Sequence, residues 1–216
     1  MTARFVCLAN SSKEGGRCIA GIELDNDNNP VIFNGRPKWI RPVCDTVHGE
    51  IPIPVAEPFQ LLDIIQVDEA FPKPQGYQSE NIIFKTESIK KVGVFQADRL
   101  NELCDSTQHL FINRIDALTD EEISNLDHSL LLIKPRVFKV VERINPNNHE
   151  QTKHRLAFSY NGCMYDFSIT DLAFLKKYQK SAEFFERITE IFLLLSVGVK
   201  FPVTNKYYKL VAGIIY

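Results

Sequence analysis

One short stretch of the sequence, FSYNGCMYDFSIT at residues 158–170, restricts the fold more than any other. Asn161-Gly162 is a dipeptide that type I′ hairpin turns prefer, because both of its residues tolerate a positive φ angle. Apolar and aromatic residues alternate with polar residues on both sides of it, as in strands that bury one face. The stretch therefore predicts a β-hairpin and a fold that contains antiparallel sheet.

The segments around this hairpin predict a five-stranded barrel. RVFKVVERI (136–144) is rich in β-branched and aromatic residues, and Asp171 can cap a helix over LAFLKKYQK (172–180). ITEIFLLLSVG (188–198) and YYKLVAGIIY (207–216) follow as strands. Three strands, a helix and two strands is the order of the Greek-key OB-fold. An alternative is that EFFERITEIFLLL (183–195) forms a helix, which would remove the fourth strand.

The first half of the chain is also mainly β. Strands are predicted over 3–9, 18–24, 30–33, 38–43, 60–67 and 81–84. Helical turns are predicted over 96–104 and over 119–128, where Thr119 and Glu122 form a capping box. We therefore expect a mostly β protein of two tandem OB-like Greek-key barrels. The first is expected over 1–118, a helical linker with a lead-in strand over 119–135, and the second barrel over 136–216.

Several sequence stretches together resemble one known family. They are CLANSSKEGGRCIAGIEL (7–24), KWIRPV (38–43), LLDIIQV (61–67), YQSENIIF (77–84), the hairpin of residues 158–171 and the final YYKLVAGIIY. In this order they resemble the bacterial dual OB-domain proteins. The resemblance implies two OB-like barrels in tandem and no established activity or catalytic residues. DSTQHLFINRID (105–116) stands where the resemblance leads us to expect a segment with tryptophan and glycine.

Composition excludes several classes of protein. The 216 residues are 44% hydrophobic, which indicates a folded globular chain. The longest apolar run (191–199) is far shorter than the roughly 20 residues that cross a bilayer, and the first ten residues lack a signal peptide's apolar stretch. We therefore expect a cytoplasmic protein without membrane contact. Five scattered cysteines without C-x-x-C and five scattered histidines predict neither disulfides nor a metal site.

Charge is distributed unevenly along the chain. The net charge is −2, but residues 1–118 carry 12 basic and 16 acidic side chains, whereas residues 134–216 carry 13 and 7. A basic C-terminal half can attract phosphates, and it can equally attract the acidic half.

The loop LANSSKEGGRC (8–18) is the first candidate site. Gly15 and Gly16 could turn backbone N–H groups toward an anion, while Lys13 and Arg17 supply charge. The spacing is not that of a P-loop, and a strand rather than a helix follows. The simplest interpretation is a hairpin connection. The loop also occupies the place of the ligand-gripping first loop of OB-folds.

The stretch NGRPKWIRPV (34–43) is the second candidate. A nucleic-acid base could stack on Trp39 while Lys38 and Arg41 hold phosphates. The alternative is that Trp39 closes the bottom of the barrel and that Arg41 pairs with a carboxylate such as Asp45 or Asp63.

Two further segments complete the predicted nucleic-acid contacts. Gln78 and Asn81 could hydrogen-bond a base or ribose, although loop amides more often satisfy backbone groups. Lys206, Tyr207 and Lys209 mix cations with an aromatic ring on the last strand.

The sequence predicts no catalytic residue and no cofactor, because it contains no G-x-S-x-G or H-E-x-x-H motif. Whether the chain is an enzyme stays open, and a binding role is favoured. The preferred hypothesis is a tandem OB module for single-stranded nucleic acid or a nucleotide-like ligand. One alternative is a protein-interaction scaffold in a bacterial multi-protein system, for example a defence system. Another is a nucleic-acid-modifying enzyme with its site between the barrels.

Overall fold

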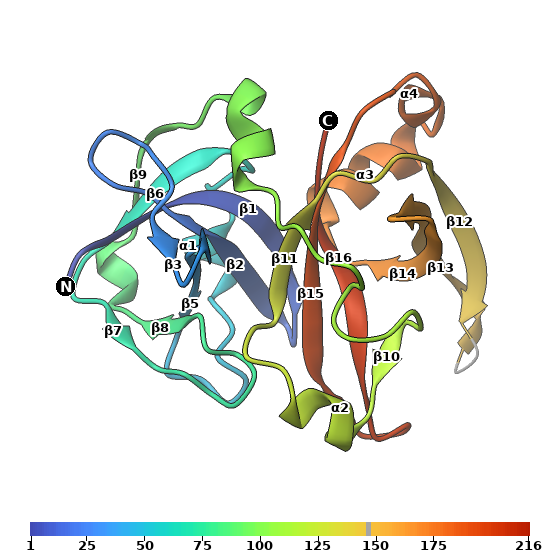
Figure 1. The fold of residues 1–216 in the computed structure, drawn as a ribbon, viewed down its shortest axis with the longest axis horizontal. Coiled ribbons are helices and arrows are strands. Elements are labelled where there is room, and N and C mark those ends of the chain that lie inside the picture. The colour runs from blue at the N-terminus through green and yellow to red at the C-terminus, as the bar shows by residue number, and fades with distance from the viewer. Residues whose placement is uncertain (146–147) are drawn as a thin grey trace. The chain divides into compact units, whose positions relative to one another are not determined.

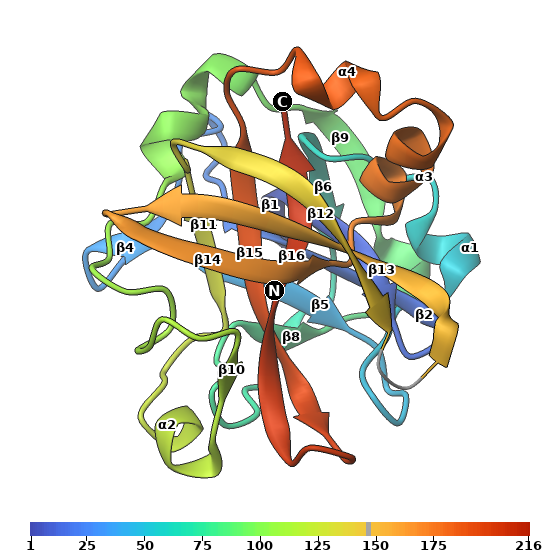
Figure 2. The ribbon, with the colours of Figure 1, turned by 90° about the vertical axis from the view of Figure 1, so that its right-hand side faces the viewer.

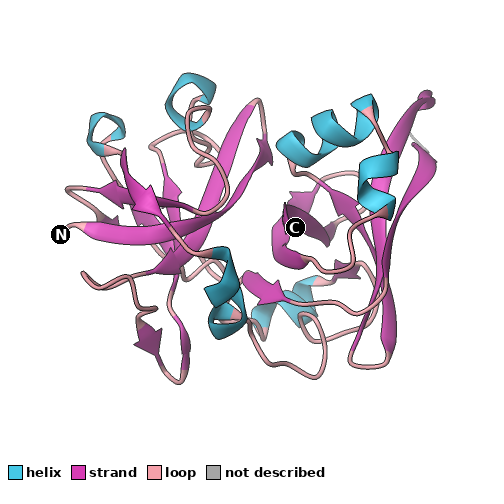
Figure 3. Ribbon diagram, turned by 90° about the horizontal axis from the view of Figure 1, so that it is seen from above, coloured by secondary structure: helices cyan, strands magenta, loops and turns pink. Residues whose placement is uncertain are grey.

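A computed structural model describes residues 1–145 and 148–216 and divides the chain into two compact units. The first unit is Met1–Asp105 and the second is Ser106–Tyr216. Strands dominate both units, with short helices between them (Figures 1 and 3). The mostly β fold class predicted from the sequence is confirmed.

The first unit is shorter than the first barrel expected from the sequence. The expected boundary at residue 118 and the expected linker of residues 119–135 both fall within the second unit. The reason is strand pairing, because two strands of that region join strands near the end of the chain. These pairs are β10 (Ala117–Leu118) with β16 (Lys206–Ile215), and β11 (Leu130–Ile133) with β15 (Phe192–Phe201).

The first unit is built on a seven-stranded sheet in the order β7-β8-β5-β2-β1-β6-β9. Its strands are β1 (Ala3–Lys13), β2 (Gly16–Glu23), β5 (Trp39–Val43), β6 (Asp63–Val67), β7 (Phe71–Pro72), β8 (Asn81–Ile83) and β9 (Lys90–Val94). The unit also contains the hairpin of β3 (Ile32–Phe33) and β4 (Arg36–Pro37), helix α1 (Ile53–Ala56), and 3-10 helices η1 (Thr86–Ser88) and η2 (Ala97–Leu103).

One chain segment closes this first sheet. β8 pairs with β5 in parallel, whereas β9 pairs with β6 in antiparallel. Only residues 84–89 separate β8 from β9, so residues 81–94 contact strands at both ends of the sheet. This arrangement is barrel-like, as in the partly open barrel of an OB-fold.

The glycine-rich loop is a tight hairpin connection. Lys13 pairs with Gly16, and the turn between them consists of Glu14 and Gly15 with φ angles of 39° and 82°. Positive φ at both positions is typical of a type I′ turn. A Cβ atom at Gly16 would lie 2.7 Å from the carbonyl oxygen of Ile51. The second glycine therefore permits close packing of the chain.

The second unit contains the sheet β11-β15-β16-β14-β13-β12, with β10 on β16. Its remaining strands are β12 (Phe138–Asn145), β13 (Asn148–Tyr160) and β14 (Cys163–Ile169). Its helices are α2 (Asp120–Ser124), α3 (Leu172–Lys180) and α4 (Glu183–Glu186), seen in Figure 2. β14 and β16 pair in parallel, as the Greek-key order of an OB-fold requires.

A split first strand closes the second barrel. β11 pairs with β15, and β12 pairs with β13, so consecutive strands reach both ends of the sheet. Residues 134–137 separate β11 from β12 and include Pro135, which cannot donate a ladder hydrogen bond. The chain is thus a tandem of two OB-like barrels, as the sequence predicts.

The local sequence signals of the second barrel are confirmed. Asn161 and Gly162 have φ angles of 47° and 76° and connect Tyr160 to its ladder partner Cys163. The inward residues of this hairpin form an aromatic core, in which Phe158 stacks on Tyr165 at 5.6 Å between ring centroids.

Residues 183–195, for which the sequence left two interpretations, divide between a helix and a strand. Helix α4 ends at Glu186, and β15 begins at Phe192. The barrel therefore keeps its fourth strand. The capping box of α2 is also present, with Thr119 Oγ1 accepting from Glu122 N and the Glu122 carboxylate accepting from Thr119 N.

No helix in residues 1–145 and 148–216 is both long and apolar enough to cross a membrane. None of the five cysteines forms a disulfide within the described residues, and Cys7 and Cys44 are buried.

A buried carboxylate joins α3 to the last strand. Asp171 is 2% exposed; its Oδ1 accepts a hydrogen bond from Phe174 N, and its Oδ2 accepts one from Ile214 N, both at 3.0 Å. Burial raises the pKa of this carboxyl. The N-cap predicted from the sequence therefore also fixes the helix to β16.

We expect Asp171→Asn to lower the free energy of unfolding by about 1–3 kcal/mol, because the amide can accept only one of the two buried hydrogen bonds. Urea titration measures the change. Asp45→Asn is the control, since Asp45 is exposed and its ion pair with Lys73 should contribute little. Equal effects of the two substitutions would contradict this role.

Candidate nucleic-acid interface

Arg41, which the sequence places among the ligand contacts, is buried in the first unit. Its side chain is 2% exposed, and Nη2 lies 2.9 Å from Glu80 Oε1, which is also buried. Its backbone N donates to the carbonyl oxygen of Glu80 at 2.9 Å, so two contacts join β5 to the start of β8. The acids suggested as alternative partners form other ion pairs, Asp45 with Lys73 and Asp63 with Lys91.

Gln78 and Asn81 lie beside this ion pair and are buried as well. Asn81 is the ladder partner of Arg41, and its Nδ2 donates to Gln78 Oε1 at 3.2 Å. Both side chains are less than 10% exposed. The structure therefore brings three predicted site residues together, but as a buried polar cluster beneath the surface.

Trp39 and Lys38 are not available as the predicted stacking platform. Trp39 is 8% exposed, so the indole belongs to the core of the first unit and not to a concave surface. The ammonium of Lys38 forms an ion pair with the carboxylate of Glu23. The structure thus favours the alternative in which the indole is part of the barrel core. Neither Trp39 nor Lys38 belongs to the ligand contacts that we propose.

Lys13 is a predicted site residue whose side chain has no polar partner among the described residues. It ends β1 and is half-buried, and its ammonium makes no hydrogen bond or ion pair within residues 1–145 and 148–216. Burial lowers the pKa of Lys13, and the nearby Arg41 guanidinium lowers it further, whereas Cys18 and Glu50 raise it. The Arg41 guanidinium is thus near enough to act electrostatically on the Lys13 ammonium, and we call these two cations the Lys13–Arg41 pair.

The loop of residues 46–51 forms one wall beside the Lys13–Arg41 pair. A Cβ atom at Gly49 would lie 3.8 Å from Lys13 Nζ. The carboxylate of Glu50 accepts hydrogen bonds from Thr46 Oγ1 at 2.8 Å and from His48 N at 3.1 Å. Glu50 supplies a nearby negative charge, but these donors already occupy its Oε2 atom.

Arg17 lies on the same hairpin but on its other face. Its ladder partner is Ser12, whereas Lys13 pairs with Gly16, and neighbouring ladder positions point to opposite faces. Two backbone hydrogen bonds of 2.9 Å join Arg17 to Ile51 and hold the loop of residues 46–51. Arg17 is therefore apart from the Lys13–Arg41 pair.

Lys209, a predicted contact in the second unit, is also buried. Its Nζ donates to the carbonyl oxygens of Leu110 and Asn113 at 2.7 and 2.8 Å, and to Asn113 Oδ1 at 2.6 Å. These bonds hold a strained loop, in which Phe111 and the β-branched Ile112 have φ angles of 53° and 74°. Burial lowers the pKa of Lys209 to about 7.

Lys206 and Tyr207 begin the same strand in a more open position. Lys206 is exposed and is the ladder partner of Phe201, whose side chain is 40% exposed. Tyr207 Oη donates to Asp120 Oδ1 at 3.1 Å, and Lys200 Nζ donates to Asp120 Oδ2 at 2.7 Å. The tip of the β15–β16 hairpin thus presents a cation next to an aromatic ring.

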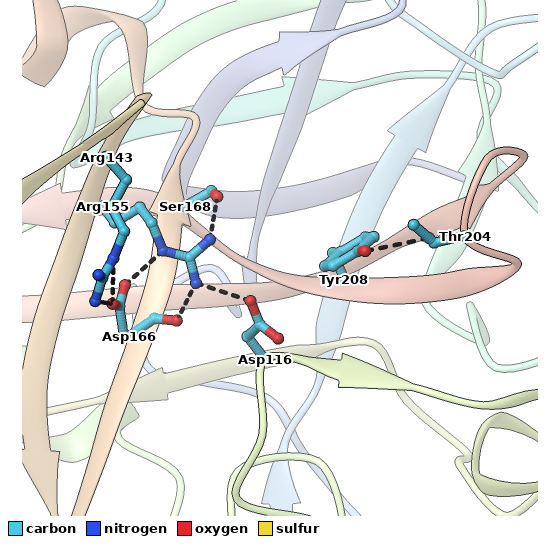
Figure 4. A network of polar contacts seen from close by, with 7 residues as sticks. All are labelled: Asp116, Arg143, Arg155, Asp166, Ser168, Thr204 and Tyr208. Atoms are coloured by element: carbon cyan, nitrogen blue, oxygen red, sulfur yellow. Dashed lines mark hydrogen bonds and ion pairs between the residues drawn. The ribbon is translucent and has the colours of Figure 1, made fainter. Parts of the chain in front are cut away.

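The sequence analysis missed an arginine network on the outer face of the second barrel. Arg155 contacts Asp166, Ser168 Oγ at 3.0 Å and Asp116 Oδ2 at 2.8 Å, and Arg143 reaches the same Asp166 at 2.8 Å (Figure 4). The signal was present in the sequence, because these residues alternate with the buried ones along the hairpin.

Figure 4 also shows Tyr208 donating to Thr204 Oγ1 at 3.1 Å near the tip of the β15–β16 hairpin. Within residues 1–145 and 148–216, no group of three or more His, Cys, Asp or Glu side chains could hold a metal ion. Lys13 of the first unit is suited to contact an anion. Lys206 and Phe201 of the second unit are suited to contact an anion and an aromatic ring.

The sequence matches the family described as Dual OB-containing domain over residues 3–214. A search of curated protein sequences finds no match. A chain from the structure of a replication protein A heterotrimer bound to ssDNA is 11% identical, with a TM-score of 0.35 over 92% of this chain and 44% of that one. This chain thus spans less than half of that relative's length.

A second solved structure comes from work on the molecular basis for abrogation of activation of pro-inflammatory cytokines. It is 9% identical, with a TM-score of 0.38, and the match covers 100% of this chain and 93% of that one. Because both TM-scores are low, neither structure supports a conclusion about the function of this chain.

The buried Lys209 should make stability depend on pH. Its pKa is about 7 in the folded state and 10.5 in the unfolded state, so the unfolded state binds more protons between these values. The free energy of unfolding should therefore gain a contribution from Lys209 as the pH rises from about 7 toward 10. Chemical denaturation of the wild type and of Lys209→Met across this range measures it. A stability difference between them that stays constant with pH would contradict the buried titration.

Proposed function

We propose that this chain, which belongs to the dual OB-containing domain family, is a binding module for single-stranded nucleic acid or a nucleotide-like ligand. The proposed primary contact is a phosphate on the Lys13 ammonium of the first barrel. The proposed second contact is a base on the tip of the β15–β16 hairpin of the second barrel. Each contact lies within one unit.

The observation that carries the proposal is the state of Lys13. Moving an ammonium out of water is unfavourable unless an anion or several acceptors replace the lost hydration. Lys13 is half-buried near a second cation, and residues 1–145 and 148–216 give its ammonium no hydrogen bond or ion pair. A ligand anion would supply the missing partner.

A phosphate suits this position better than other anions for two reasons. An OB barrel recurrently presents its loops and sheet face to oligonucleotides, and β1, β2 and β5 supply the neighbouring strands here. A bound phosphate also offers several oxygens, so it could accept more than one hydrogen bond from the Lys13 ammonium.

The second contact rests on exposed groups of the β15–β16 hairpin. Phe201 is 40% exposed, and the rings of Phe201 and Tyr208 lie 6.1 Å apart in an edge-to-face arrangement. The exposed Phe201 ring beside Lys206 could stack on an unpaired base, an interaction worth about 1–3 kcal/mol per base.

A protein-binding role is the second candidate function. The short β3–β4 hairpin presents two neighbouring apolar side chains, Ile32 at 57% and Phe33 at 63% exposure. Adjacent exposed apolar residues of this kind are more typical of protein interfaces than of nucleic-acid contacts. In this alternative the chain is a scaffold, and oligonucleotide binding would be absent even at low salt.

The decisive test is binding of a fluorescent oligothymidylate over a series of salt concentrations. We expect Lys13→Met to weaken binding about threefold to tenfold, equally across sequences, and to make the salt slope shallower by about 0.7, the value for one lost phosphate contact on a single strand. Lys38→Met is the matched control, because Lys38 pairs with Glu23 outside the proposed contact.

Circular dichroism would confirm that both variants remain folded. Wild-type protein that fails to bind at low salt would contradict the proposed function. Equal loss of affinity in Lys13→Met and Lys38→Met would contradict the assignment of the phosphate to Lys13.

A further inference from the structure

The second unit contains a cavity of about 350 Å³ between strand β12 and helices α3 and α4, three elements that Figure 2 shows close together. It is lined by Phe138, Lys139, Val140, Tyr178, Ala182, Phe185, Glu186 and Ile188. This volume falls in the range of small-molecule sites, roughly 300–1,000 Å³.

The aromatic walls of the cavity are fixed by their own packing. Phe138 and Phe185 lie 5.5 Å apart, measured between ring centroids. Phe174, behind the wall, packs edge-to-face on Phe185 at 5.1 Å and stacks on Tyr178 at 5.8 Å. Because α3 and α4 hold these rings, the cavity presents preformed aromatic faces.

The polar groups near the cavity are mainly acidic. Glu186 lines the cavity and makes no ion pair within residues 1–145 and 148–216. Glu142 lies on β12, with Oε1 at 3.3 Å from Nε2 of His154, whose ring packs edge-on against Tyr178. Burial raises the pKa of Tyr178, and both carboxylates raise it further, which places Glu142 and Glu186 near its phenol.

We propose that this cavity binds a small organic cation of the alkylammonium class, with its alkyl chain against the aromatic rings and its charge beside Glu186. Aromatic faces attract cations through the ring quadrupole, and a carboxylate without an ion pair supplies the counter-charge. An anion would be repelled by Glu186 and Glu142. A neutral ligand would gain only the apolar contacts.

The positive charge of Lys139 disfavours binding of a cation in this cavity. It is an exposed residue that also lines the cavity, so its ammonium competes with the ligand for Glu186. Lys139→Met should therefore strengthen binding of the cation about threefold, whereas a site for anions would be weakened by the same change.

The test uses the full chain and three probes of matched length: butylammonium, 1-butanol and butyrate. Two-dimensional NMR should show butylammonium shifting resonances of Tyr178 and Phe185 at millimolar concentration, with affinity about tenfold above that of butanol and no shifts from butyrate. N-acetyl-lysine methylamide is a fourth probe. It distinguishes a free alkylammonium, which should bind better, from a lysine side chain of a protein.

Glu186→Gln should reduce butylammonium affinity about fivefold and leave butanol binding unchanged. Glu183→Gln is the matched control, because Glu183 belongs to the same short helix but does not line the cavity. Tyr178→Leu should weaken butylammonium more than butanol, since it removes a ring and keeps an apolar wall. Equal affinities for butanol and butylammonium, or equal effects of the two glutamine variants, would overturn the proposal.

Discussion

The buried ion pair between Arg41 and Glu80 is the interaction on which the first barrel depends. It joins β5 to the start of β8, and the parallel ladder that follows closes the sheet. Removing one partner would leave an uncompensated buried charge, which typically destabilises a protein by about 3–5 kcal/mol. The Arg41 guanidinium also lowers the pKa of Lys13, so the residue that joins these strands affects the proposed phosphate contact.

The second barrel buries a cation in a different way. Lys209 donates to three neutral oxygens of Leu110 and Asn113 and has no carboxylate ion partner among the described residues. Its pKa therefore falls, and its bonds hold a loop with two strained residues. A guanidinium stays charged under all these conditions, whereas a buried ammonium can lose its proton. The two barrels thus use buried cations of different chemistry for similar structural tasks.

Local signals in the sequence predicted much of the fold. The Asn161-Gly162 turn, the Asp171 cap and the alternation of the hairpin strands depend on residues close in the chain, and each appears as expected. The orientation of Trp39 and Arg41 was not predictable in this way, because every residue of β5 is buried. Alternation separates two faces of a strand but cannot reveal that loops far away in the sequence cover both. The burial of Lys209 likewise depends on residues 110–113, which no local pattern connects to it.

We propose above all that the half-buried ammonium of Lys13 binds an anion. Titration of this ammonium by NMR is the most direct test. In the free protein, the pKa of Lys13 should lie below 10.5, because burial and Arg41 disfavour the charged form. Adding pyrophosphate, as a minimal phosphate ligand, should raise that pKa, since a bound anion favours the ammonium. A Lys13 pKa that does not change with pyrophosphate would contradict the account.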